Sequence, residues 1–379
     1  MKTALVHSEA YRRFDYGPGH PLRMERLGLT YALMEAYGLT TLPTTRVIAP
    51  EPAPDPVLRG FHTAEYLEVL RAASAGHEVP MPYRYGLGPG DNPIWPGVYE
   101  ASALACGGSV RAAELVAAGE VDRAFAFAGG LHHALPDRAS GFCYLNDAVL
   151  AIQALRARGL RVCYVDIDAH HGDGVQFAFY DSPDVLTIST HERGDRLFPG
   201  TGFVEEMGTG AGRGYAVNLP LHPHTDDQVY LEAFEAVVPP LVRAFRPDVV
   251  VAQLGIDSHR TDPLTHLALS VEGFAEAVGR IVRLAPRLVA LGGGGYDLSN
   301  VARAWTAAWG LMNAVELPER LPATFVSAAA AHLRGRVTLW DRPEPLPEPV
   351  VRTAREYARQ QVAELERRVF PLHRATGAR

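Results

Sequence analysis

Metal-binding side chains occur where predicted strands end. Asp168 and His170 follow the apolar run 162–165, and Asp257 follows the valine-rich run 248–254. Asp168 and His170 are two positions apart, so they point to the same side of an extended chain. Two carboxylates and one imidazole leave a fourth metal position open for water, as in catalytic zinc sites. Because no ligand is a thiolate, Fe(II), Co(II) or Mn(II) can compete with zinc. The alternative is that Asp168 and His170 only cap the next helix.

Two adjacent histidines follow another strand end. His132 and His133 come directly after a glycine pair and a leucine, and they could lie beside a metal-bound water. Such a water has a pKa of about 7, and a neighbouring imidazole can accept its proton. Asp166 and Asp173 are carboxylates that could set the tautomers of the two imidazoles. A histidine pair can also serve as filler in a core or on a surface, so this hypothesis depends on convergence with the metal ligands.

A tyrosine follows an unusual run of four glycines. Tyr296 comes directly after Gly292–Gly295. Glycines let the backbone pass close to a ligand, and a hydroxyl at that point could donate to an oxyanion. The alternative is a turn tyrosine packed on the surface. The run does not match the dinucleotide fingerprint, and the glycine-rich stretch 208–214 lacks the Lys-Ser/Thr of a phosphate loop, so we expect no nucleotide cofactor.

Apolar runs that predict strands alternate with helical patterns. Strands are expected at 123–127, 162–165, 185–189, 215–219, 248–254 and 287–291, and helices at 145–158, after Gly172, and at 226–245, 271–284 and 300–312. This alternation predicts an α/β fold with a mainly parallel sheet and helices on both faces. Ligands bind beyond the carboxyl ends of the strands in such sheets, which places the polar clusters in one site.

The polar clusters also bear on domain organisation. They span residues 91–296 and have to converge, so we expect one domain over residues 1–379. A charged C-terminal helix at about 350–369 should pack on the outside. The proline-rich stretches 50–56 and 341–349 are expected to be surface connections.

Composition excludes several classes of protein. The chain has 379 residues, of which 47% are hydrophobic, which suffices for a large core and rules out a disordered protein. The net charge of -7 argues against a nucleic-acid partner. No stretch approaches the roughly 20 apolar residues that span a bilayer, and the run 3–6 is too short for a signal peptide. The cysteines at 106, 143 and 163 match no thiolate metal motif. We therefore expect a soluble cytoplasmic protein with reduced thiols.

Six motifs in order resemble those of the zinc-dependent histone deacetylase superfamily, and most of all its bacterial acetoin-utilisation branch. They are His132-His133-Ala134, Gly141 to Asp147, Asp166 to Gly174, Phe198-Pro199-Gly200-Thr201-Gly202, Gly255 to Ser258 with Asp262-Pro263-Leu264, and Gly292 to Tyr296. The resemblance covers residues 15 to 315. It implies an arginase-like α/β fold and a metal-dependent amidohydrolase that removes acetyl groups from lysine side chains of proteins and releases acetate.

The resemblance also implies a role for each motif residue. Asp168, His170 and Asp257 would hold the catalytic ion, which is zinc in the family. His132 would pair with Asp166, and His133 with Asp173, with His133 as the main acid/base. Tyr296 would polarise the acetyl carbonyl.

Further implied roles concern the substrate and a second cation. Phe142 and Phe198, with Gly141 beside them, would line a narrow tunnel, Leu264 would lie at its gate, and Asp91 would hold substrate backbone amides at the rim. Arg26 resembles an arginine of the family's internal acetate channel. Asp166 and Ser189 fall where the family binds structural potassium.

Three alternatives remain open at this point. An acetylpolyamine deacetylase would use the same chemistry, but its cationic substrates favour an acidic gate, and Leu264 is apolar. A binuclear ureohydrolase shares the fold, but it needs more carboxylates near Asp168, and Gly172 offers no side chain. A non-enzymatic acyl-lysine binder would not need the complete set of catalytic residues. The physiological substrate and the oligomeric state are not determined by the sequence.

Overall fold

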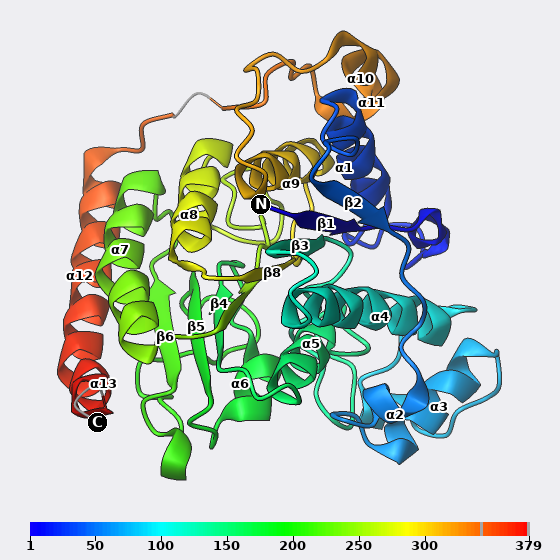
Figure 1. Ribbon diagram of the computed structural model, residues 1–379, viewed down its shortest axis with the longest axis horizontal. Helices are drawn as coiled ribbons and strands as arrows, with labels where there is room; N and C mark the ends of the chain where they lie inside the picture. The colour runs from blue at the N-terminus through cyan, green and yellow to red at the C-terminus, as the bar shows by residue number, and fades with distance from the viewer. Residues whose placement is uncertain (342–343, 377–379) are drawn as a thin grey trace.

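The computed structural model describes residues 1–341 and 344–376 and contains one eight-stranded sheet, whose order is β2-β1-β3-β8-β7-β4-β5-β6 (Figure 1). The strands are β1 (Thr3–Val6), β2 (Thr45–Ile48), β3 (Arg123–Ala126), β4 (Val162–Asp166), β5 (Val185–Glu192), β6 (Ala216–Leu221), β7 (Val249–Gln253) and β8 (Leu288–Leu291). Every pair of neighbouring strands is parallel. The carboxyl ends of all the strands therefore meet at one edge of the sheet.

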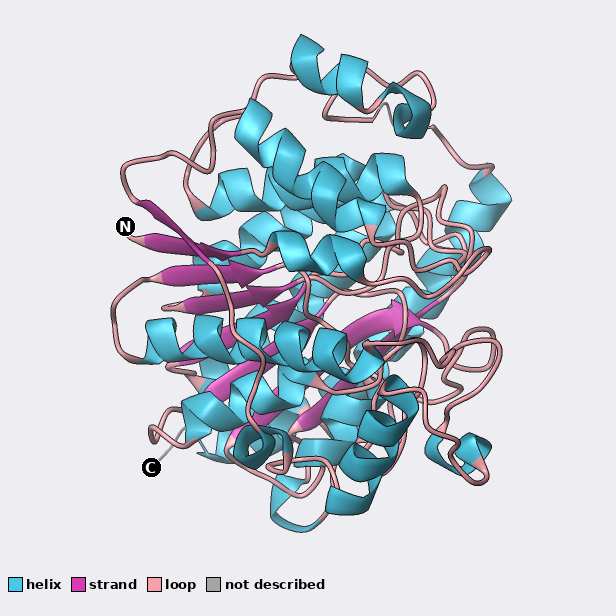
Figure 2. Ribbon diagram, turned by 90° about the vertical axis from the view of Figure 1, so that its right-hand side faces the viewer, coloured by secondary structure: helices cyan, strands magenta, loops and turns pink. Residues whose placement is uncertain are grey.

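Helices cover both faces of this sheet (Figure 2). One face carries α1 (Glu25–Ala36), α7 (Asp227–Phe245), α8 (Val271–Leu284) and α9 (Leu298–Met312), and the other carries α4 (Val98–Ala117), α5 (Asp147–Arg156) and α6 (Asp173–Phe179). The remaining helices are α2 (Asp55–Leu58), α3 (Ala64–Ser74), α10 (Ala323–Ala328), α11 (Ala330–Leu333), α12 (Glu348–Arg368) and α13 (Phe370–Thr376). The predicted fold class, a single-domain α/β fold, is confirmed.

Strand β4 explains why apolar runs predicted buried strands here. Cys163 and Val165 belong to the hydrophobic cluster on one face, while Val162 and Tyr164 belong to the cluster on the other. A strand covered on both faces needs apolar side chains on both, so its sequence is continuous rather than alternating.

The elements predicted after residue 123 all occur, with boundaries within three residues of those expected. The sequence pattern did not predict β1, β2 or the helices before residue 123. Strand β2 is at the edge of the sheet and has no buried residue, so it lacks a continuous apolar run. Helix α4 is buried on nearly all sides and rich in alanine, glycine and serine, so it lacks the apolar stripe that identifies an amphipathic helix.

Most described residues of the two proline-rich stretches are exposed or half-buried, as surface connections should be, and the buried exceptions are Pro50, Ala53 and Asp341. Ala53 is 6% exposed because the backbone of this stretch packs on α4. Asp341 is also 6% exposed, because several donors surround its carboxylate. Positions 342 and 343 lie outside the described residues. Helix α12 packs on α7 and β6, at the outer side of α7 in Figure 1. No helix among the described residues has the length and apolarity needed to cross a membrane.

The packing of α4 predicts the effect of one substitution. A Cβ at Gly107 would lie 1.8 Å from the Glu51 carbonyl oxygen and 2.8 Å from the Ala53 nitrogen, and both are backbone atoms that cannot rotate away. We expect Gly107→Ala to lower the free energy of unfolding by about 1–3 kcal/mol, as overpacking does. Gly28→Ala in α1 is the matched control, because its nearest contact would be 3.5 Å. That variant should gain about 0.5–1 kcal/mol. Denaturant unfolding measures both, and a Gly107→Ala midpoint at or above wild type would contradict the packing argument.

Candidate active site

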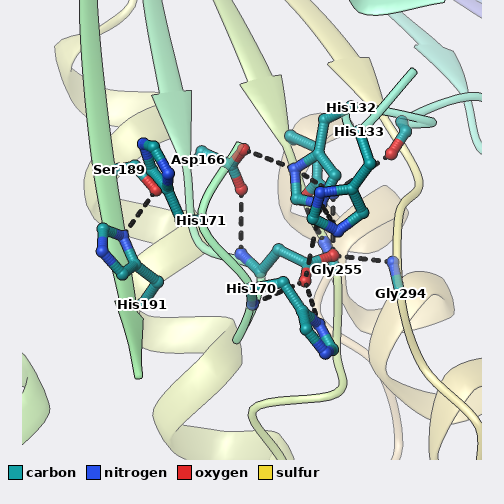
Figure 3. A network of polar contacts seen from close by, with 12 residues as sticks. His132, His133, Asp166, His170, His171, Ser189, His191, Gly255 and Gly294 are labelled. Carbon is teal, nitrogen blue, oxygen red and sulfur yellow. Dashed lines mark hydrogen bonds and ion pairs between the residues drawn. The ribbon is translucent and has the colours of Figure 1, made fainter. Parts of the chain in front are cut away.

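Two carboxylates and one imidazole converge beyond the ends of β4 and β7. One ligand atom each from Asp168, His170 and Asp257 lies within 4.8 Å of the others, and all three residues are buried. His170, labelled in Figure 3, has its Nδ1 2.8 Å from Asp257 Oδ2 and 3.1 Å from Asp168 Oδ1. The three residues proposed as metal ligands from the sequence therefore lie together.

Hydrogen bonds to one oxygen of each carboxylate fix the direction in which the other oxygen points. Asp168 Oδ2 accepts from Gln253 Nε2 at 2.8 Å and from the Gly294 N–H at 2.7 Å. Asp257 Oδ1 accepts from the Ala169 N–H at 2.8 Å. The other oxygen of each carboxylate faces His170. Asp168 Oδ1 also accepts from the His170 backbone N–H at 2.9 Å. One oxygen of each carboxylate and one imidazole nitrogen form a donor set that fits a divalent metal ion.

The pKa values of Asp257 and His170 also indicate a site for a cation. Burial and the neighbouring charge of Asp168 raise the pKa of Asp257 to about 6. Burial opposes the charged form of His170, but Asp257 and Asp168 raise its pKa well above the usual value. The negative charge of the two carboxylates therefore favours added positive charge, which a bound cation would supply.

Glycine is required where the ligands approach the backbone. A Cβ at Gly294 would lie 2.0 Å from Asp257 Oδ2, and one at Gly255 would lie 1.9 Å from Asp168 Oδ2. Any side chain at these positions would displace a proposed metal ligand. Close packing against Asp257 thus explains Gly294 of the run before Tyr296, whereas Gly292 and Gly293 pack on the Phe127 carbonyl and on Gln253.

The histidine pair lies beside the proposed metal ligands, and each imidazole has its own carboxylate. His132 Nδ1 is 2.8 Å from Asp166 Oδ2, and His133 Nδ1 is 2.7 Å from Asp173 Oδ1. The two Nε2 atoms are 3.0 Å apart. Burial, together with the positive charge of His132, lowers the pKa of His133 to about 4. Burial also disfavours charge on His132, but Asp166 and Asp168 raise its pKa to about 9. Near pH 7, His133 is therefore neutral and can accept a proton.

Three further residues orient these groups. Asp147 accepts hydrogen bonds from the N–H groups of Gly130 and Leu131, which fixes the turn before His132. Tyr164 donates to Asp166 at 2.7 Å. Gln253 donates to Asp168. The sequence analysis assigned none of them a role, although Gln253 is the single polar side chain of β7 and was a usable signal.

Tyr296 lines a cavity of about 20 Å³ together with His132, His133, Asp168 and His170. Its backbone N–H donates to Asp262 Oδ2 at 2.8 Å, and its ring meets Phe142 edge-on with the centroids 5.7 Å apart. Within residues 1–341 and 344–376 its hydroxyl has no hydrogen-bonding partner. Burial and the charges of Asp257 and Asp168 raise its pKa well above the usual value, so the hydroxyl stays protonated and can donate.

Aromatic rings surround the entrance to this cavity. The ring of Phe198 lies edge-on to His133, with the centroids 5.0 Å apart, and Gly141 lies between these two side chains. His20, which the sequence analysis missed, meets Phe142 edge-on and bonds to the backbone oxygen of Asp91. Asp91 is exposed and Leu264 half-buried. Phe142 and Gly141 line the cavity and Phe198 contacts His133, while the rim role of Asp91 and the gate role of Leu264 stay predictions.

Two other predicted assignments gain only partial support from the geometry. Arg26 is buried beside the cavity and donates to the carbonyls of Gly293 and Gly295. Asp166 and Ser189 are register partners on β4 and β5, and Ser189 Oγ is 2.8 Å from His191 Nδ1. An acetate channel at Arg26 and a potassium site at Asp166 and Ser189 stay predictions.

The sequence of this chain is similar to those of the histone deacetylase family. The histone deacetylase domain matches residues 20–312. The acetoin utilization protein AcuC of Bacillus subtilis is 39% identical over 337 residues, which are 86% of this chain and 85% of that protein. Histone deacetylase RPD3 of Saccharomyces cerevisiae is 40% identical over 323 residues, which are 85% of this chain and 74% of that protein.

Solved structures agree with this similarity. The structure of a histone deacetylase homologue from Aquifex aeolicus superposes with a TM-score of 0.84 and 34% sequence identity. The superposed region covers 94% of this chain and 100% of the Aquifex chain. A structure of a histone deacetylase homologue complexed with SAHA superposes with a TM-score of 0.85, with the same identity and coverage.

The ligand geometry predicts how metal content responds to mutation. Purified wild-type protein should contain about one equivalent of a divalent metal ion, and Asp257→Ala should contain far less, because one of three protein ligands is lost. Asp173→Asn is the matched control, because its carboxylate contacts His133 and not the three ligands. Elemental analysis gives the metal content, and an unchanged value in Asp257→Ala would rule out this ligand set.

Proposed function

The chain belongs to the histone deacetylase family and is a hydrolase of amide bonds, and we propose that its substrates are acetylated lysine side chains of proteins. The supporting observation is that one small cavity is lined by Asp168, His170, the two imidazoles of the histidine pair and Tyr296, whose hydroxyl has no hydrogen-bonding partner among the described residues. Asp257 completes the group of three side chains fit for a metal. This set can both activate a water and stabilise the oxyanion of amide hydrolysis.

In this mechanism Asp168, His170 and Asp257 would hold a divalent ion, which we expect to be zinc or, in its place, Fe(II), Co(II) or Mn(II). When bound, the ion supplies Lewis acidity and lowers the pKa of water. His133 Nε2 accepts the proton of the attacking water, since this imidazole is neutral near pH 7. Asp173 fixes its tautomer through Nδ1 and stabilises the imidazolium that forms.

Tyr296 and the protonated histidine complete the reaction. The Tyr296 hydroxyl donates to the oxyanion that develops on the acetyl carbonyl, and its raised pKa keeps the proton in place. His133 then gives its proton to the leaving lysine nitrogen and the C–N bond breaks. The acetic acid and amine so formed exchange a proton and leave as acetate and the lysine ammonium. Asp166 orients the His132 ring through Nδ1 at 2.8 Å, so that its Nε2 lies 3.0 Å from His133 Nε2.

The alternatives are less well supported by the same geometry. A polyamine substrate carries extra ammonium groups, and an apolar Leu264 would leave them unpaired at the entrance, which is costly. A ureohydrolase needs a second metal ion. Within the described residues, Asp168, His170 and Asp257 are the one three-ligand group found. A binder without activity would have no use for the histidine–carboxylate pairs.

The role of Tyr296 predicts a specific kinetic effect. Tyr296→Phe removes only the hydroxyl, so kcat should fall by roughly 10²–10³-fold, the range for one oxyanion donor. Metal content should stay at the wild-type level, because the hydroxyl contacts none of the three ligands. Steady-state kinetics with elemental analysis checks both. A fall in kcat below about threefold, with chemistry rate-limiting, would make Tyr296 a structural residue.

The entrance predicts substrate class. Asp91 can accept hydrogen bonds from peptide N–H groups, which a polyamine lacks, and a charge-assisted bond is worth about 1.5–3 kcal/mol. We expect kcat/KM for an acetyl-lysine peptide to exceed that for N-acetylputrescine and N8-acetylspermidine, and Asp91→Ala to reduce the preference roughly tenfold to a hundredfold.

Leu264→Glu is the converse variant for this test. It adds a carboxylate at the gate, so it should raise kcat/KM for the acetylpolyamines and leave the Asp91 effect on peptides unchanged. Wild-type protein that favours the polyamines would reject the acetyl-lysine assignment. Peptide preference that survives Asp91→Ala would reject only the role of the rim carboxylate.

A further inference from the structure

A buried polar cluster lies outside the catalytic cavity and connects it to a segment beyond residue 312. Its central residues are Asp341, His259 and Arg303, which are 6%, 1% and 0% exposed. His259 follows the proposed metal ligand Asp257 by two positions, and Arg303 lies on α9. Asp341 comes after the region that matches the histone deacetylase domain, residues 20–312. The chain after α9 passes through α10 and α11 above α1 before it returns to this point (Figure 1).

The Asp341 carboxylate joins four donors. Its Oδ2 accepts from His259 Nε2 at 2.8 Å and from the Val271 N–H at 3.0 Å. Its Oδ1 accepts from Arg303 at 2.9 Å and from Arg336 at 2.7 Å. Burial alone would raise the pKa of Asp341, but the His259 hydrogen bond and the Arg303 charge hold it below the usual value. Asp341 is therefore a fixed, charged anchor.

His259 has one orientation within this cluster. Its Nδ1 accepts from the Thr261 N–H at 3.2 Å and is 2.8 Å from the side-chain nitrogen of Asn300. Since Nδ1 accepts, the proton resides on Nε2, where it donates to Asp341. The imidazole thereby links the loop after β7 to α9 and to the C-terminal segment.

The same loop holds Tyr296 through one hydrogen bond and its neighbour Asp297 through another. The Thr261 hydroxyl donates to Asp297 Oδ2 at 2.7 Å. The neighbouring Asp262 accepts from the Tyr296 N–H through Oδ2 and from the Leu264 N–H through Oδ1, at 2.8 and 3.0 Å. Tyr296 follows four glycines, whose backbone has little stiffness of its own. These cross-links therefore supply the rigidity that the glycine run lacks.

We propose that Asp341 is a positioning residue for deacetylation. Through His259 and Arg303 it fixes the loop 257–265 against the start of α9, and so holds the Tyr296 hydroxyl over the cavity and Leu264 at the gate. This role rests on the proposed function, because it acts on the tyrosine assigned there. It makes the segment after residue 312 part of the active-site scaffold.

Asp341→Asn tests the role of the anchor. The amide keeps the shape of the side chain but turns one acceptor into a donor that faces Arg or His donors. We expect kcat to fall by about 10- to 100-fold, as small displacements of catalytic groups do, with KM and metal content near wild type. Asp55→Asn is the matched control, because that carboxylate also accepts from an arginine and a tyrosine, Arg71 and Tyr99, in a cluster without site residues. The control should keep wild-type kcat.

A double-mutant cycle separates positioning from general destabilisation. If Asp341 acts through the Tyr296 hydroxyl, Asp341→Asn should lower kcat less than about twofold in a Tyr296→Phe background. An equal fall in both backgrounds, or no fall in either, would overturn the positioning role. A Tyr296→Phe variant with wild-type kcat would instead reject the proposed role of the hydroxyl.

A second variant decides the matter if Asp341→Asn does not fold. Thr261→Val keeps the side-chain shape and removes only the hydroxyl that bonds to Asp297. It should show a smaller fall in kcat with the same dependence on Tyr296. Independent effects of Thr261→Val and Tyr296→Phe would also overturn the proposal.

Discussion

The repulsion between two buried carboxylates, Asp168 and Asp257, is the constraint on which the rest of the site depends. Neither contacts an arginine or lysine within the described residues, and the His170 imidazole lies beside both. Charge buried without a counter-ion is unfavourable, so the carboxylates need either a proton or a cation. The raised pKa of Asp257 expresses this need. A metal ion would resolve it and acquire an open coordination position.

The parallel sheet makes such a concentration of charge possible. Parallel strands end at the same edge, so ligands from β4 and β7 meet without a long loop. Backbone N–H groups there hold one oxygen of each carboxylate and compensate part of the burial cost. Glycines at 255 and 294 let the backbone come close enough to do this.

The different surroundings of His132 and His133 give these two imidazoles different pKa values. His132 sits against the buried Asp166 and is held charged, whereas His133 feels that charge and is held neutral. Tyr296 experiences the same negative field, which keeps its hydroxyl protonated. One set of buried carboxylates therefore determines which groups accept protons and which donate them. The hydrogen bonds that run from Tyr296 through Asp262 to the C-terminal segment determine where these groups stand.

The sequence alone was sufficient for the fold class and for the residues that could do chemistry. Continuous apolar runs identified the buried strands, and the motifs after them supplied Asp168, His170 and Asp257, because those signals are local. It could not reveal the early helix α4, whose small side chains have no stripe. The residues that orient the site were also hidden. Asp341 and His259 are 82 positions apart in the chain, and no local pattern relates them. A hydrogen-bonding partner is selected by proximity in space, so only the tertiary structure decided which polar residues hold the catalytic groups.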